Sequence, residues 1–164
     1  MIPFLLQDKL VERMEKEFEH FRLKDPQQDP VENEEEQLYV PLNIYRQELP
    51  EKPADDVTLY PYLRIELSDG REDAEEGPHL ARVLFTVAVY DRDSSYQGYK
   101  YLSTIMQKVY ENLKRWPIID KIADLQYPIQ WMFHEEDLYP FFFGGLVTNW
   151  SIAQIMRDDI GEMI

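Results

Sequence analysis

The sequence predicts an α+β domain: a four-stranded, mainly antiparallel, mixed sheet with two main helices packed on it, plus an extended arm. Three observations predict it: two stretches with apolar residues at helical spacing, two pairs of alternating stretches, and one alternating stretch interrupted by proline. A chain of 164 residues can bury about 70% of its unfolded surface around one core. We divide it into an amphipathic helix (1–24), an acidic, proline-rich linker and arm (25–59), an α+β core (60–158) and a tail (159–164).

Two segments have the periodicity of amphipathic helices. From Pro3 to about Leu23 apolar side chains recur at steps of three or four, and Pro3 suits a first helical turn. A second helix of about five turns is expected after the turn-forming residues 91–95, and Pro117 ends it. The apolar positions that mark the helices are Leu6, Leu10, Met14, Phe18 and Phe21 in the first, and Tyr99, Leu102, Ile105, Met106, Val109 and Leu113 in the second.

The stretch from Leu38 to Gln47 alternates like a strand, but Pro41 removes one backbone donor from its middle. An interior strand does not fit this pattern. An edge strand, or an arm laid along a neighbouring subunit, fits it better. The apolar positions available for such a contact are Leu38, Val40, Leu42 and Ile44.

A first hairpin is expected from residues 60–67 and 82–90. The earlier stretch is apolar on one face, whereas the later one is apolar on both faces from Val83 to Val89, as in a covered central strand. A turn at Ser68–Gly70 and a highly charged insert, 71–79, connect the two. The insert is too acidic to pack in a core.

A second hairpin is expected from residues 127–133 and 146–152, with 134–145 as its connection. This connection contains Tyr139 and Pro140, followed by three consecutive phenylalanines at 141–143. If these residues form a strand, successive side chains point to opposite faces, so both faces bury aromatic side chains. Core packing within one chain and a protein–protein contact both explain this cluster.

The charge is strongly negative and unevenly distributed. The chain has 17 Lys and Arg against 32 Asp and Glu, a net charge of −15. Residues 25–80 hold 16 acidic and four basic side chains, a net −12, whereas residues 1–24 are neutral and residues 81–164 carry −3. A solvated acidic surface explains the excess, and so does a surface that repels a polyanion. Specific nucleic-acid binding is not expected, because no basic stripe is present.

No motif predicts catalysis. The chain has no cysteine, which removes disulfides, thiolate metal sites and cysteine nucleophiles. At His134–Asp137 one histidine precedes three carboxylates, but the second histidine of a zincin motif is missing. Asp91 and Asp93 begin like a calcium loop, although Tyr96 stands where that loop requires glycine. We expect no enzyme activity, no cofactor and no metal. We also expect no membrane partner, since no run of about 18 apolar residues occurs.

Four segments form a recognisable series: Val83–Asp91, Gly98–Leu102, Pro128–Trp131 and Tyr139–Trp150. Together they resemble the tail terminator (tail completion) proteins of long-tailed bacteriophages and prophages, over residues 38–158. The likeness rests on structural positions in a shared order and includes no catalytic signature. It implies a non-enzymatic virion protein with helices packed on a small sheet, which agrees with the fold expected above.

The resemblance implies a ring, commonly of six subunits, that caps the tail tube at the head–tail joint. The implied partners are further copies of the chain, the tail tube protein and the head connector. Assembly of the virion would take place in the cytoplasm of the bacterial host. A ring requires two complementary patches on each subunit. The residues expected to form them are Leu38, Val40, Leu42 and Ile44 in the arm, and Phe141, Phe142 and Phe143 in the aromatic segment.

The same resemblance suggests a role for the acidic insert. DNA must pass through the tail tube, and a channel lined by carboxylates lets a polyanion slide without adhering. The candidates for this lining are Glu72, Asp73, Glu75 and Glu76. Two alternatives stay open: an acidic DNA mimic or other phage accessory binding protein, and a carboxylate metal enzyme built on Asp91, Asp93 and residues 134–137.

Overall fold

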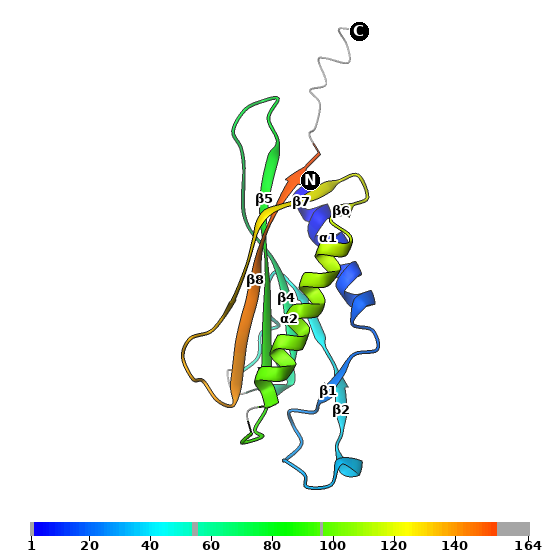
Figure 1. Ribbon diagram of the computed structural model, residues 1–164, viewed down its shortest axis with the longest axis vertical. Helices are drawn as coiled ribbons and strands as arrows, with labels where there is room; N and C mark the ends of the chain where they lie inside the picture. The colour runs from blue at the N-terminus through cyan, green and yellow to red at the C-terminus, as the bar shows by residue number, and fades with distance from the viewer. Residues whose placement is uncertain (1, 54–55, 96, 154–164) are drawn as a thin grey trace.

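The computed structural model describes residues 2–53, 56–95 and 97–153. Two helices, α1 (Ile2–Glu17) and α2 (Gln97–Arg115), lie on the same face of a long twisted sheet (Figure 1). The first packs against β3 and β4 and the second against β5 and β8. The α+β class, the two helices and the mixed sheet are therefore confirmed.

The main sheet has six strands in the order β3-β4-β5-β8-β7-β6, and a separate two-stranded sheet pairs β1 with β2. Only the β3–β4 pair of the main sheet is parallel. The strands of the main sheet are β3 (Asn43–Arg46), β4 (Tyr62–Glu72), β5 (His79–Tyr90), β6 (Ile118–Ile119), β7 (Ala123–Phe133) and β8 (Phe141–Ile152). The expectation of four strands is wrong, because the short edge strands β3 and β6 add to the two predicted hairpins, β4–β5 and β7–β8.

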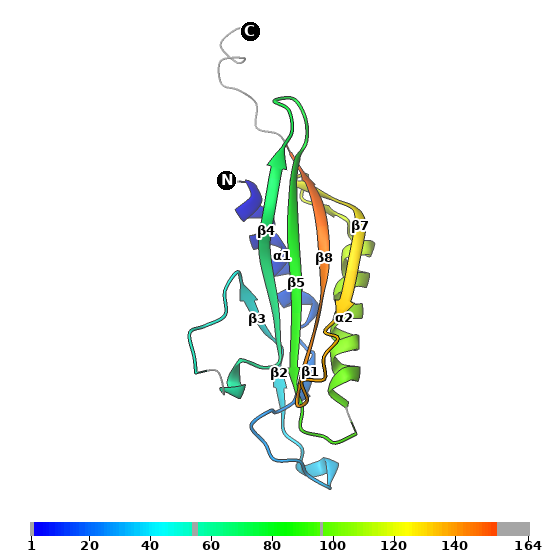
Figure 2. The same cartoon turned by 90° about the vertical axis from the view of Figure 1, so that its left-hand side faces the viewer.

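The first helix ends at Glu17, six residues earlier than expected, and a turn follows it. The chain then enters β1 (Arg22–Lys24), which pairs with β2 (Tyr39–Pro41) so that Leu23 lies opposite Val40. Leu23 is 1% exposed, so this apolar position contributes to the core from a strand and not from a helix. We call β1, β2 and the connecting residues 25–38 the β1–β2 arm; it extends below the body of the molecule (Figures 1 and 2).

Two short 3₁₀ helices lie in the long connections, η1 (Glu34–Glu36) in the arm and η2 (Val57–Leu59) before β4. Each begins at a polar cap: the side chain of Asn33 accepts a hydrogen bond from the Glu35 N–H, and that of Asp56 accepts one from the Thr58 N–H. The expected end of the core, 154–158, and the tail, 159–164, lie outside the described residues.

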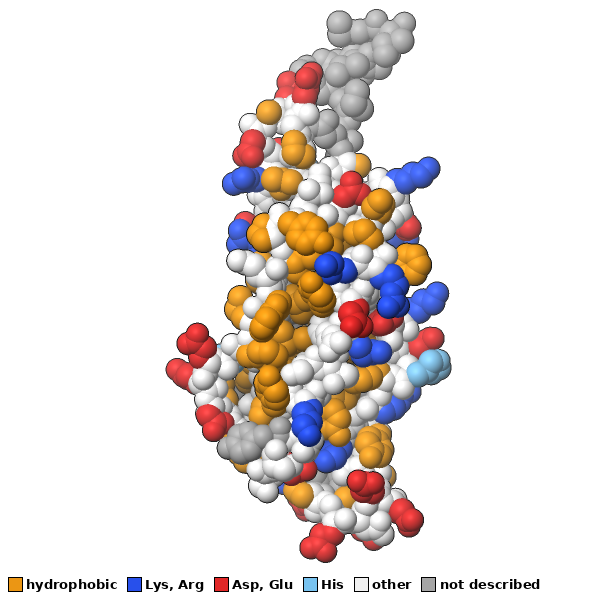
Figure 3. Space-filling model, viewed as in Figure 1, with side chains coloured by type: hydrophobic (Ala, Val, Ile, Leu, Met, Phe, Trp, Pro, Cys, Tyr) orange, Lys and Arg blue, Asp and Glu red, His pale blue; other side chains and the backbone are white. Residues whose placement is uncertain are grey.

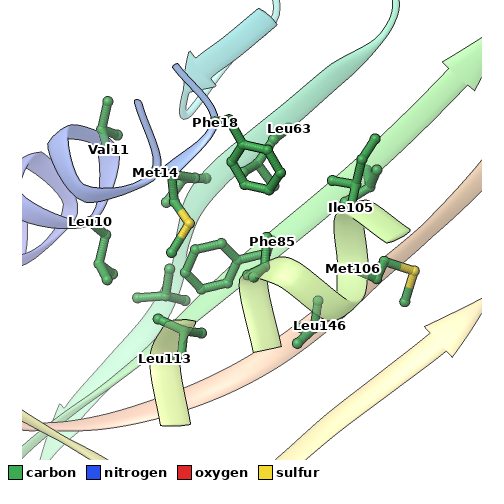
Figure 4. Packing of buried hydrophobic residues seen from close by; sticks show 14 of the residues in the cluster. Leu10, Val11, Met14, Phe18, Leu63, Phe85, Ile105, Met106, Leu113 and Leu146 are labelled. Carbon is green, nitrogen blue, oxygen red and sulfur yellow. The ribbon is translucent and has the colours of Figure 1, made fainter. Parts of the chain in front are cut away.

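The core fills the space between the helices and one sheet face. Side chains from α1, α2 and the strands converge around Phe85, which is fully buried (Figure 4). Two polar groups within this core are hydrogen-bonded: Thr148 donates to the carbonyl of Val83 at 2.8 Å, and the Trp150 indole donates to the Thr148 hydroxyl at 2.9 Å. A rigid sheet and helix layer therefore sets where the surface residues point.

Candidate interaction surfaces

The aromatic segment opens β8 and uses both faces of the sheet. Phe142 points toward α2, where its ring lies over Gly98: a Cβ at Gly98 would come within 2.4 Å of that ring. Phe141 and Phe143 point to the opposite face and stack on each other, with ring centroids 6.2 Å apart and ring planes at 14°. All three phenylalanines thus have partners within their own chain.

A second, smaller cluster forms on the face that carries no helix. It is centred on Leu59, Tyr62 and Ala88, with Tyr60 and Phe143 packed against it. Burial raises the pKa of Tyr62 to about 12, with smaller contributions from the neighbouring side chains. This cluster fixes the connection between β3 and β4 to the sheet and covers part of its open face.

Residues 38–47, which the sequence predicted to form an edge strand or an arm on a neighbouring subunit, are folded largely onto their own chain. Leu42 is 7% exposed and belongs to the main core, and Ile44 in β3 packs against the same core. Val40 is half-buried opposite Leu23. Leu38, at 57% exposed, is the member of the predicted set that remains available at the surface, and Tyr39 beside it is 53% exposed.

Polar contacts fix the β1–β2 arm to the loop that follows β5. Lys24 pairs with Asp93 at 3.4 Å, and Arg92 pairs with Asp29 at 3.0 Å and donates to the carbonyl of Gln28 at 2.8 Å. Hydrogen bonds donated by the backbone and hydroxyl of Ser95, together with Lys24, lower the pKa of Asp93. The arm is therefore held in one orientation by ion pairs at its base.

Asp91 lies beside this contact and is 9% exposed. One carboxylate oxygen accepts a hydrogen bond from the Asp93 N–H at 2.9 Å, and the other, Oδ2, is buried and accepts none from the described residues. The adjoining cavity has a volume of about 60 Å³. In residues 2–53, 56–95 and 97–153, no three His, Asp or Glu side chains are grouped so as to hold a metal ion.

The histidine and carboxylates at 134–137 lie in the loop between β7 and β8. This loop adjoins the one that holds Asp91, since the Asp91 N–H donates to the Pro140 carbonyl at 2.9 Å. His134 approaches Glu136 only at 3.9 Å, and both side chains are well exposed. The two loops of the metal-enzyme hypothesis are therefore neighbours, but their described side chains form no metal-binding group.

The acidic insert is shorter than expected. β4 runs to Glu72 and β5 begins at His79, so that residues 73–78 form the tip of a hairpin that projects past the end of the sheet (Figures 1 and 2). Two side-chain contacts lie along its stem: the ion pair of Arg71 with Asp73 at 3.3 Å, and the contact of His79 Nδ1 with a Glu72 carboxylate oxygen at 3.3 Å. Residues 69–79 hold five acids and one arginine. We call residues 69–79, which comprise the tip and the adjoining ends of β4 and β5, the acidic hairpin tip.

Sequence reasoning did not predict the exposure of three large apolar residues on β7. Tyr127, Trp131 and Met132 are 72%, 63% and 54% exposed. Trp131 is opposite Leu146 in register and so lies on the helix side, whereas Met132 is opposite Gly145 and lies on the other side. The alternation at 127–133 predicted a strand, but the exposure follows from the strand order, which places β7 near the edge of the sheet.

An apolar groove lies between α2 and β7, with a cavity volume of about 310 Å³. It is lined by Ser103, Met106, Gln107, Tyr110, Trp131, Phe133 and Leu146. In Figure 3 apolar side chains form a band over this part of the molecule, with Lys and Arg side chains beside it. We call this the α2–β7 groove.

The outer edge of β7 is open beside the groove. β6 pairs with Ala123 and Asp124, and Leu125 donates to the carbonyl of Pro117 at 2.8 Å. Beyond Leu125, β7 has no strand neighbour on that side within the described part of the chain. An open edge offers backbone donors and acceptors to an added strand.

The sequence matches no protein-family model and no curated protein. Among the described residues, no helix has the length and apolar content needed to cross a membrane.

Proposed function

We propose that this protein is a tail terminator, or a neighbouring component of the head–tail joint, of a long-tailed phage or prophage. It acts without catalysis, as a homo-oligomeric ring that caps the tail tube, and six subunits are expected. The family in this proposal comes from the sequence resemblance described above. The observation that supports assembly best is the placement of large exposed apolar side chains on separate parts of an acidic molecule, among them Leu38 and Tyr39 on the arm, and Tyr127 and Trp131 on β7.

Two separate patches are what a ring requires. An isolated chain rarely leaves a large contiguous apolar patch in water, so such patches mark contacts with other molecules. When the two patches differ, each copy joins the next head to tail, and the contacts close into a ring if the rotation permits. The main sheet, with α1 and α2 packed on one face, is the rigid frame that holds the patches apart.

The acidic hairpin tip suits the passage of DNA. Its net charge is −4, and it projects beyond the sheet on a two-stranded stem. Placed around a central opening, Glu72, Asp73, Glu75 and Glu76 would repel the phosphate backbone and prevent adhesion. We propose that these carboxylates face the channel of the ring.

Tail-tube length tests the function directly. Purified tail tube protein from the same phage genome is allowed to polymerise with and without this chain, and tube lengths are measured by negative-stain electron microscopy. We expect tubes that are shorter and blunt-capped at one end, with a ring at the cap. An unchanged length distribution, with no density at either end, would refute the terminator role.

A further inference from the structure

We call Leu38 and Tyr39 the arm patch, and Tyr127 and Trp131 the β7 patch. The two patches differ in shape. The β7 patch borders a recess, the α2–β7 groove of about 310 Å³, which is in the size range of sites that enclose a bound group. The arm patch is a projection, since Leu38 and Tyr39 lie on a segment that extends away from the body (Figure 1). A recess and a projection on one chain are complementary in shape.

The two patches are also complementary in charge. The arm residues 25–38 contain six acidic side chains and no Lys or Arg. Helix α2 contains four basic side chains and one acidic one, a net +3 in a chain of net −15. Lys114 lies 5.4 Å from the ring centroid of Tyr110 at one end of the groove. At the other end Lys100 lines the adjoining cavity, together with Glu135, Glu136 and Asp137. The basic end of the groove is therefore the one at Lys114.

The arm is organised before any contact is made. The side-chain oxygen of Gln28 accepts hydrogen bonds from the Leu38 N–H and from the Gln37 amide, both at 2.8 Å, and the Gln28 amide donates to the Glu36 carbonyl at 2.9 Å. These bonds fix Leu38 next to η1 and its acidic residues. A projection that is already ordered loses little conformational entropy when it docks.

The structure assigns the α2–β7 groove as the socket for the β1–β2 arm of a second copy of this chain. Leu38 and Tyr39 enter the apolar recess beside Trp131, the carboxylates of the arm meet Lys114 in the basic last turn of α2, and the open edge of β7 lies alongside the entering segment. In one molecule the arm lies on the α1 side and the groove on the β7 side (Figure 1), so each copy can fill its neighbour's socket. This inference rests on the proposed ring and names the surfaces that form it.

Mixing of variants tests the assignment. L38D damages the projection, W131D damages the socket, and F4D, at a residue 56% exposed on α1, is the control. Masses are measured by size-exclusion chromatography with light scattering. We expect the wild type and F4D to form the same oligomer, L38D and W131D to be monomers, and their equimolar mixture to give dimers and nothing larger. In each dimer the undamaged arm of W131D occupies the undamaged socket of L38D, and no undamaged surface is left to bind a third copy.

The other outcomes distinguish a wrong socket assignment from a wrong ring proposal. If the wild type forms oligomers but L38D and W131D do so equally, or if their mixture stays monomeric, the socket assignment is wrong and the ring stands. If the wild type is monomeric at every concentration and with tube protein present, the ring itself is wrong.

Disulfide trapping gives a second measurement that does not depend on damaging either surface. Because the chain has no cysteine, L38C and Q107C introduce single thiols into the arm and the groove. Oxidation of their mixture should yield a covalent heterodimer, and oxidation of the double variant L38C/Q107C should yield a ladder of covalent multimers. Absence of the heterodimer while the wild type is oligomeric would overturn the assignment.

Discussion

Gly98 allows the start of α2 to approach β8. A Cβ at this position would lie 2.4 Å from two ring carbons of Phe142, far inside van der Waals contact. The glycine is therefore required by a close approach between helix and strand and not by an unusual backbone conformation. Phe142, which the sequence offered as an interface residue, is used here to seat the helix.

Replacing Gly98 with alanine tests this contact. We expect the free energy of unfolding to fall by about 1–2 kcal/mol, because overpacking outweighs the gain in helix propensity. Urea denaturation followed by circular dichroism measures it. Gly77→Ala is the matched control, since the nearest atoms to a Cβ there are at 3.4 Å, an ordinary contact. A G98A protein as stable as the wild type would contradict the packing described here.

Tyr62 links stability to alkaline pH. Burial raises its pKa from 10.0 to about 12, so the folded state favours the neutral phenol. The stability it contributes is complete below pH 10 and is lost as the pH rises through 12.

The Tyr62→Phe variant should be less sensitive to this change. Between about pH 9 and about pH 11.5 we expect the wild type to lose on the order of 2 kcal/mol more free energy of unfolding than Y62F. Urea titrations at the two pH values measure the difference. Tyr99→Phe, at a residue 53% exposed, should behave like the wild type. Equal losses in wild type and Y62F would show that Tyr62 ionises normally.

At the scale of elements, Arg13 of α1 binds the carboxy-terminal end of α2. Its guanidinium donates to the carbonyl of Asn112 at 3.1 Å and also to the carbonyl of Trp116. The Asn112 carbonyl accepts the Trp116 N–H as well, at 3.0 Å, and the Asn112 side-chain amide donates to the Glu17 carboxylate at 3.3 Å. A cation is favourable at this end of a helix dipole.

Substitution of Arg13 by leucine removes this cap while it keeps an apolar stem. We expect a loss of about 1–2 kcal/mol in the free energy of unfolding and faster amide exchange in the last turn of α2. Hydrogen exchange monitored by mass spectrometry locates the effect. Lys16→Leu, on the same helix at an exposed position, should leave exchange in α2 unchanged. Uniform protection in R13L would rule out the capping role.

The elements that the sequence predicted are those with a local pattern. The apolar spacing of α2 and the alternation within β4, β5, β7 and β8 are set by residues close in the chain. β3 lies within residues 38–47, which were expected as an edge strand or an arm, and it forms one edge of the main sheet. Its parallel pairing with Tyr62–Ile65 was not predicted, because it joins segments distant in the chain. β6 was missed because it has two residues. The end of α1 was misplaced because Phe18 and Phe21 continue the helical spacing, although they follow Glu17 and pack on the core from outside the helix.

Candidate surface residues were harder to predict than elements. Whether an apolar residue is core or surface depends on strand order, which no local pattern encodes. The phenylalanines at the start of β8 pair with β5 and are half-buried, whereas Trp131 on β7 is 63% exposed. Leu42 was offered as a contact residue and is buried in its own chain, whereas Leu38, four residues earlier, remains accessible.

At the scale of the whole molecule, charge decides how copies meet. The chain carries −15, so copies repel one another unless opposite charges are placed together. The arm residues 25–38 and helix α2 provide such a pair. Salt screens the interaction between exposed charges: the Debye length is about 10 Å at 0.1 M and becomes shorter as the salt concentration rises.

Self-association should therefore respond to salt through the arm. We expect the dissociation constant between copies to rise at least about threefold between about 0.05 and 0.5 M NaCl, as measured by sedimentation velocity. The triple variant E34Q/E35Q/E36Q should associate more weakly at low salt and lose most of this dependence. A salt response that is identical in the triple variant would place the electrostatic contact elsewhere.

The mass of the purified chain in solution tests the central claim most directly. Multi-angle light scattering over a range of concentrations is predicted to show one discrete species, about six times the 19.7 kDa of a single chain. A mass of 19.7 kDa at every concentration, unchanged when tail tube protein is added, would contradict assembly into a ring.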